Sequence, residues 1–122
     1  TDVTGFGLLG HLSEMCEASN TSAIVHFEDV PVIDRDILQF YLDQKCVPGG
    51  TNRNWDSYGH KIAGASEAQR SVLADPQTSG GLLVAVAPGH EAEFQRVAAE
   101  AGCIMEPLGF MIEQQPVLIT VV

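Results

Sequence analysis

Residues 1–20 read TDVTGFGLLGHLSEMCEASN, and this stretch predicts an amphipathic helix behind a glycine-punctuated start. Apolar side chains recur there at intervals of about one helical turn and form a single stripe, which consists of Leu8, Leu9, Leu12, Met15 and Cys16. Thr4 is suited to cap this helix at its N-terminus, and Asn20 is suited to end it. We therefore expect the chain to begin with a helix whose apolar stripe faces the core.

Four later segments have the composition of β-strands. Residues 23–28 place Ala, Val and Phe on one face and Ile, His and Glu on the other. Residues 82–87 read LLVAVA and are apolar throughout, which is typical of a central strand covered on both faces. Two closing strands are expected at residues 108–112 and 117–121, with a turn between them.

Three further helices are expected, two of them capped by Asp34 and Ser66 and the third ended by Gly102. Residues 51–64 have no regular pattern and favour a loop with a short helix. The first and last of the three helices should each bury an apolar stripe, made of Ile37, Leu38, Tyr41 and Leu42 in one and of Phe94, Val97, Ala98 and Ala101 in the other.

Strands and helices thus intermix without a regular βαβ alternation. They predict an α+β (α/β layered) fold in which a mixed sheet of about four strands packs with helices. The chain has 122 residues, of which 45% are apolar and 18% charged, and this size and balance fit a single globular domain over residues 1–122.

The charge of the chain excludes one class of partner. Sixteen acidic residues stand against six basic ones, so the net charge is −10. Binding to nucleic acid requires clustered Lys and Arg that displace counterions from phosphates, and the basic residues form no cluster. We therefore expect no nucleic-acid partner, and we interpret the acidity as solvated helix faces.

Cysteine and histidine patterns predict neither a zinc site nor a disulfide framework. The three cysteines (Cys16, Cys46 and Cys103) are widely spaced, and neither they nor the histidines form a cluster. Cys103 is expected to pack inertly after a helix end, whereas Cys46 could be exposed. Reduced thiols in a cytoplasmic protein are expected. No apolar run approaches the ~20 residues that span a bilayer, and the absent start methionine indicates a fragment of a longer protein.

The first segment with the residues for chemistry is the N-terminal one. Asp2 stands just before a glycine-rich helix start, where free backbone N–H groups can face a phosphate. A carboxylate beside a phosphate site is suited to hold Mg²⁺. The alternative is that Asp2 and Thr4 only cap the helix. His11 flanks the apolar stripe, and we expect a partly buried, hydrogen-bonded histidine there rather than a general base.

Two other segments are candidates for ligand contact. Residues 48–54, PGGTNRN, combine glycines, a guanidinium and amides, which suits anion recognition, although an ordinary polar turn would have the same composition. Residues 75–81, DPQTSGG, precede the apolar run and indicate a tightly specified loop, whose contact with a ligand stays open. We expect Gly80 or Gly81 to adopt a positive φ or to admit another backbone closely.

The strings TDVTGFGLLGHL, PGGTNRN and DPQTSGGLL, in this order, resemble the signature segments of the C-terminal domain of selenophosphate synthetases (selenide, water dikinases). That family belongs to the aminoimidazole ribonucleotide synthetase-like superfamily. The resemblance covers residues 1–83, and no comparable motif follows, although the strand and helix pattern stays compatible.

The resemblance implies an enzyme that converts ATP, selenide and water into selenophosphate, AMP and phosphate. It implies a homodimer in which ATP and metal ions lie between an N-terminal domain and this C-terminal domain. Most ligands and the reactive groups belong to the N-terminal domain. Of the family's metal-binding aspartates one matches Asp2, which implies Mg²⁺ there, and no catalytic residue maps onto this chain. Two alternatives remain: another ATP-dependent synthetase or kinase of the superfamily, or a non-catalytic interaction module.

Overall fold

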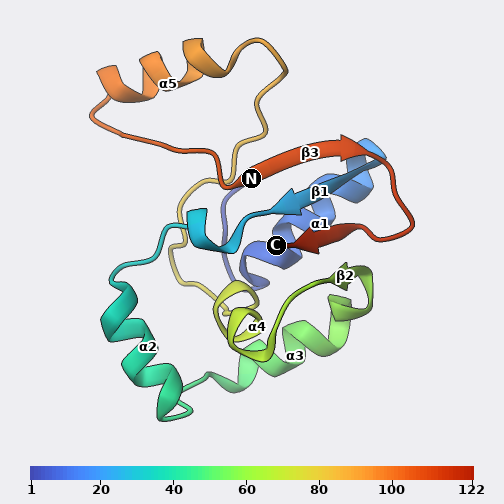
Figure 1. The fold of residues 1–122 in the computed structure, drawn as a ribbon, viewed down its shortest axis with the longest axis vertical. Helices are drawn as coiled ribbons and strands as arrows, with labels where there is room; N and C mark the ends of the chain where they lie inside the picture. The colour runs from blue at the N-terminus through green and yellow to red at the C-terminus, as the bar shows by residue number, and fades with distance from the viewer.

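A computed structural model describes all residues, 1–122, as a four-stranded sheet surrounded by five α-helices (Figure 1). The strand order is β2-β4-β1-β3, and the bounds are Thr21–Val25 for β1, Ile62–Ala63 for β2, Gly109–Glu113 for β3 and Ile119–Val121 for β4. Strand β1 is antiparallel to β3 and parallel to β4, and β2 is parallel to β4. The layered fold and the mixed sheet of about four strands are therefore confirmed.

The helices begin and end largely where short-range signals place them. Their bounds are Gly7–Ser19 for α1, Arg35–Asp43 for α2, Gly49–Tyr58 for α3, Glu67–Leu73 for α4 and Glu91–Glu100 for α5. Asn20 ends α1 in the left-handed conformation, with φ 54°. The Asp34 carboxylate accepts a hydrogen bond from the Ile37 amide at the start of α2, and Ser66 forms a reciprocal capping box with Gln69 at the start of α4. No helix has the length and apolar character needed to cross a bilayer.

The core lies between α1, the sheet and the α3–α4 pair. Helix α1 turns its stripe toward β1, and Leu9, Leu12 and Cys16 are buried there as expected. The sheet contributes alternate residues, with Ala23 and Val25 buried on β1 and Ile119 and Val121 on β4. In Figure 1, α1 covers one face of the sheet, while α3 and α4 lie beyond the β2 edge.

The predicted central strand at residues 82–87 is wrong. Only Leu82 makes a bridge, with Asp2, and most of the segment is exposed. An apolar run becomes a strand only where a neighbouring backbone offers a continuous ladder. Here the partner is the N-terminal segment, which turns into α1 within a few residues. The fourth strand is instead the two-residue β2, which the sequence pattern did not indicate.

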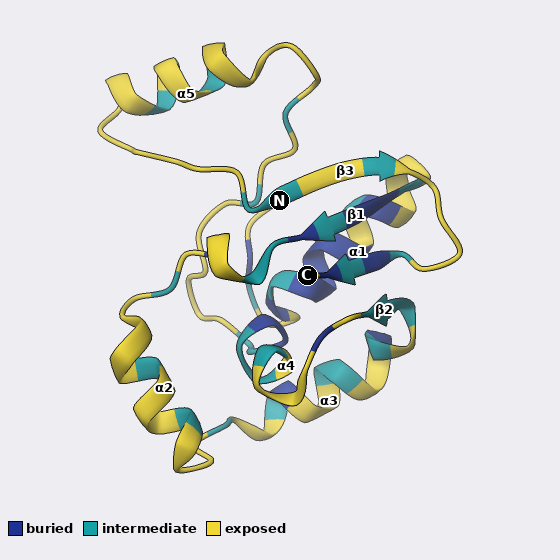
Figure 2. Ribbon diagram, in the orientation of Figure 1, coloured by how far each residue is buried: buried dark blue, intermediate teal, exposed yellow.

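The predicted burial of the α2 and α5 stripes is also wrong, although both helices exist. Ile37 and Tyr41 of α2 are exposed, as is Val97 of α5. Figure 2 shows both helices as mainly exposed, and each stands apart from the sheet. A pocket of about 350 Å³ separates α5 from β1 and β3, so the α5 stripe is not in contact with the core. Cys103, which follows α5, is exposed rather than packed, and Cys46 is exposed as well.

Residues 48–54 form the start of α3 rather than a loop, and residues 51–64 are mostly helical. Helix α3 continues to Tyr58 and passes through a 3-10 turn, Gly59–Lys61, into β2. Pro48 precedes the first helical residue, where its fixed φ suits helix entry. The Pro-Gly-Gly sequence thus begins a helix.

Candidate functional site

The first and third candidate segments pair side by side through their backbones. The Val3 amide donates to the Gly81 carbonyl oxygen at 2.8 Å, and the Gly80 amide donates to the Val3 carbonyl oxygen at 3.0 Å. One step outward, the Leu83 amide donates to the Thr1 carbonyl oxygen at 2.8 Å. This antiparallel pairing fixes the extended backbone on both sides of Asp2.

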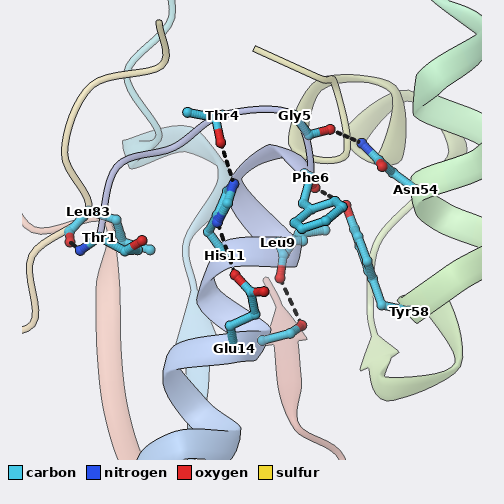
Figure 3. Close-up of polar contacts among 11 residues, drawn as sticks. Thr1, Thr4, Gly5, Phe6, Leu9, His11, Glu14, Asn54, Tyr58 and Leu83 are labelled. Carbon is cyan, nitrogen blue, oxygen red and sulfur yellow. Dashed lines mark hydrogen bonds and ion pairs between the residues drawn. The ribbon is translucent and has the colours of Figure 1, made fainter. Parts of the chain in front are cut away.

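Helix α3 holds the turn that connects this pairing to α1. The Asn54 side-chain amide donates to the carbonyl oxygens of Gly5 and Ala74, both at 2.9 Å. The Tyr58 hydroxyl donates to the Phe6 carbonyl oxygen at 2.6 Å, and Figure 3 shows both side chains reaching this turn. Burial raises the pKa of the Tyr58 phenol, so the hydroxyl keeps its proton and remains a donor.

A second set of contacts ties the start of α3 to the third segment. The Thr51 hydroxyl, which is buried, donates to one Asp75 carboxylate oxygen at 3.3 Å, and the Gln77 side-chain amide donates to the other. Burial raises the pKa of the Asp75 carboxyl, and the Thr51 hydrogen bond partly opposes that change. The three candidate segments therefore meet around one turn.

Gly7 allows a close backbone approach in this region. Its φ is +71°, and a Cβ there would lie 2.8 Å from the Ala74 carbonyl carbon and 2.9 Å from the Asp75 carbonyl oxygen. No L side chain is accommodated at that distance or readily at that φ. Gly7 is therefore required for the packing of the first candidate segment against the third.

Three polar side chains form a row that starts at Thr4, before α1, and continues along the helix. Thr4 does not cap α1 as predicted: the residue before the helix is Phe6, without a side-chain cap. The Thr4 hydroxyl instead lies 3.1 Å from His11 Nε2, and His11 Nδ1 lies 3.1 Å from a Glu14 carboxylate oxygen (Figure 3). His11 is hydrogen-bonded as expected, and at 7% exposed it is buried more fully than the partly buried histidine that was expected.

Asp2, the predicted metal ligand, is exposed, and its carboxylate makes no hydrogen bond or ion pair within the chain. No group of three or more His, Cys, Asp or Glu side chains could hold a metal ion by itself. A lone carboxylate nevertheless fits Mg²⁺, because that ion keeps several waters and shares phosphate oxygens with one or two protein carboxylates. Asp2 can therefore serve as one ligand of a site completed by other groups.

The residues of the second segment have different roles from one another. Arg53 and Asn52 are exposed near the start of α3 and form no ion pair or side-chain hydrogen bond. Asn54, by contrast, holds the turn between the paired segments and α1.

Sequence reasoning missed the anchors Thr51, Asn54 and Tyr58. Their spacing of three and four residues would have placed them on one helix face if the segment had been recognised as helical.

Comparisons with known proteins show the family to which the chain is similar. The family model for the AIR synthase related protein, C-terminal domain, matches residues 1–121. A selenide, water dikinase from Pseudomonas aeruginosa is 55% identical over 121 residues, which are 99% of this chain and 35% of that protein. Those from Pseudomonas putida and Yersinia pseudotuberculosis are 56% and 54% identical over 94% and 89% of the chain, or 33% and 31% of their own lengths.

The chain thus spans about a third of the length of these curated relatives. The match extends past residue 83, where the recognisable motifs end, and includes the region of α5, β3 and β4. The chain therefore belongs to the AIR synthase related family of C-terminal domains, and it matches the C-terminal domain of selenide, water dikinases.

Proposed function

We propose that this chain is the C-terminal, metal-donating domain of an enzyme that makes selenophosphate from selenide, ATP and water and releases AMP and phosphate. The relatives named selenide, water dikinase support the reaction, because the chain matches them over nearly its whole length. In this proposal the domain closes the ATP site and supplies one Mg²⁺ ligand. The rest of the site belongs to an N-terminal domain.

The single observation that carries the proposal is the state of Asp2. Its carboxylate is exposed and has no partner within the chain, while the backbone on both sides is pinned to residues 81 and 83. An unpaired carboxylate on a fixed backbone is suited to bind a cation that arrives with phosphates. Mg²⁺ would neutralise phosphate charge during transfer, which depends on positioning and electrostatics more than on a protein nucleophile.

The partners in this proposal are ATP and selenide as substrates, the N-terminal domain, and a second copy in a homodimer. Several large apolar side chains on this domain are exposed, among them Ile33, Phe40, Ile104 and Phe110. An adjoining domain would cover them. The three cysteines form no disulfide, which suits the reducing cytoplasm.

Asp2→Asn in the full-length protein tests the metal role. The change keeps the shape of the side chain and removes its charge, so selenide-dependent AMP release should fall by on the order of 10²-fold or more. Asp56→Asn is the matched control, since Asp56 is exposed on α3 and pairs with nothing. It should leave the rate unchanged.

Thermal melting of both variants should match the wild type. An Asp2→Asn variant with full activity at limiting Mg²⁺ would show that Asp2 only shapes the helix start. Measuring the product distinguishes the family's reaction from that of another ATP-dependent synthetase, because only the former gives selenophosphate.

A further inference from the structure

The row Glu14–His11–Thr4 is not explained by packing alone. Two hydrogen bonds of 3.1 Å link the three side chains, and both ring nitrogens of His11 are used. The imidazole is buried and lies 5.6 Å from the Phe6 ring, centroid to centroid. The Glu14 side chain at the far end is 60% exposed. The row therefore runs from solvent through a buried ring to the Thr4 hydroxyl (Figure 3).

The chemistry of the three groups sets the direction of their hydrogen bonds. An ionised carboxylate only accepts, so His11 Nδ1 donates to Glu14. In the neutral imidazole the other nitrogen is then an acceptor, and the Thr4 hydroxyl donates to Nε2. The hydroxyl proton of Thr4 is thereby committed. Its oxygen makes no other hydrogen bond in the chain, so its lone pairs are available to a ligand.

Thr4 stands two residues after Asp2 in the sequence. Residues 1–3 are paired in an antiparallel bridge, and in an extended backbone alternate side chains point to the same face. Val3, between the two, is turned into the core and is only 6% exposed. An extended backbone from Asp2 to Thr4 would place the Asp2 carboxylate and the Thr4 hydroxyl on the face opposite Val3.

An oxygen whose proton is already donated attracts a cation, or a water bound to one, rather than a phosphate oxygen. We propose that Thr4 is a second oxygen ligand for the divalent cation of Asp2, and that His11 and Glu14 are positioning residues that keep its hydroxyl an acceptor. The inference rests on the proposed metal role of Asp2 and extends it. A hydroxyl and an aspartate also share Mg²⁺ in phosphate-loop enzymes, which shows that the pairing is chemically sound.

The test compares Thr4→Val, Thr4→Ser and Glu14→Ala in the full-length protein. The binding of Mn²⁺, a probe for Mg²⁺, is measured by calorimetry with a non-hydrolysable ATP analogue present, together with the Mg²⁺ concentration that gives half the maximal rate. Thr4→Val should weaken Mn²⁺ binding and raise the half-maximal Mg²⁺ concentration, each by about 10-fold. Glu14→Ala should change both quantities in the same direction by several-fold. Removing groups around a metal is known to weaken its binding. Thr4→Ser keeps the hydroxyl and should restore cation binding to near the wild-type value.

The variants also separate a metal role from a structural tie. If Thr4→Val only lowers the melting temperature and leaves Mn²⁺ binding unchanged, the inference is overturned. If Asp2→Asn abolishes Mn²⁺ binding in the same assay while both Thr4 variants and Glu14→Ala bind normally, the inference fails and the proposed function stands. If Asp2→Asn itself binds Mn²⁺ normally, the proposed function fails and the inference fails with it.

Discussion

The carbonyl oxygen of Val3 accepts a hydrogen bond from the Gly80 amide at 3.0 Å and lies 2.7 Å from where a Cβ on Gly80 would stand. The pairing of the two segments therefore depends on the absence of a side chain at residue 80. The next residue, Gly81, has φ +82°. The expectation of a positive φ or a close backbone approach in this glycine pair is confirmed in both forms.

Alanine substitutions at these glycines should destabilise the isolated 122-residue chain. Gly81→Ala should lower the free energy of unfolding by about 1–2 kcal/mol, because an L residue is strained at positive φ. Gly80→Ala should cost at least as much, since its Cβ would meet backbone rather than a flexible side chain. Gly5→Ala is the control, because nothing lies within 4 Å of its Cβ position and its φ is not positive. Urea unfolding measures all three, and equal midpoints would contradict the argument.

Asn54→Ala should release the turn that connects the paired segments to α1. It removes one donor from two carbonyl oxygens, those of Gly5 and Ala74, so the free energy of unfolding should fall by about 1–2 kcal/mol. Asn52→Ala lies on the same helix, has no side-chain hydrogen bond and should change stability little. Equal losses in the two variants would mean that helix propensity, not the anchor, is being measured.

The stability of the chain should depend on the protonation of Asp75. Burial raises the pKa of Asp75 in the folded chain, whereas the unfolded value stays near the usual ~3.9. Between these two pKa values folding takes up a proton, so this group lowers the free energy of unfolding as pH rises through that window.

Asp75→Asn removes this titration. The stability of the variant relative to the wild type should therefore increase as pH rises from about 4 through the raised pKa of the wild-type carboxyl. The lost acceptor for Gln77 adds an offset that does not vary with pH. Chemical unfolding at several pH values gives the difference, and a difference that is constant or shrinks with pH would refute the assignment.

The sequence predicted those parts of the fold that depend on neighbouring residues. Asn20 could be recognised as the end of α1 because its αL conformation is a local property, and the same holds for the Asp34 and Ser66 caps. The apolar stripe of α1 was equally visible, since it repeats within one element. The prediction of a metal role for Asp2 also comes from a short local motif, and it stays a prediction.

The remaining parts depend on contacts between distant residues. Strand β2 has only two residues, Ile62 and Ala63, and exists because β4 lies beside it. The run 82–87 has a strand composition but lacks a ladder partner beyond Leu83. The side chains that hold the candidate site could not be predicted for the same reason. The contact from Tyr58 to Phe6, for example, spans 52 positions in the sequence.

The isolated chain should fold without hydrolysing ATP or releasing AMP in the presence of selenide. Asp2 is a single carboxylate with no acidic cluster around it, and one carboxylate holds Mg²⁺ weakly against the ion's hydration shell. A malachite green assay for phosphate and chromatography for AMP measure the two products. Selenide-dependent AMP formation by this chain alone would contradict the division of roles proposed above.

Backbone amides of residues 84–87 should exchange hydrogen with solvent almost as fast as in an unfolded chain. None of them donates a hydrogen bond, although the segment is as apolar as a buried strand. The Ala23 amide on β1 is the internal reference, because it donates to Leu118 and lies in the core, and its exchange should be slower by roughly a hundredfold or more. Exchange followed by NMR resolves both. Equal protection would mean that the segment forms a ladder. The outer edge of β3 offers a free backbone for that pairing, since β3 is one of the two edge strands of the sheet.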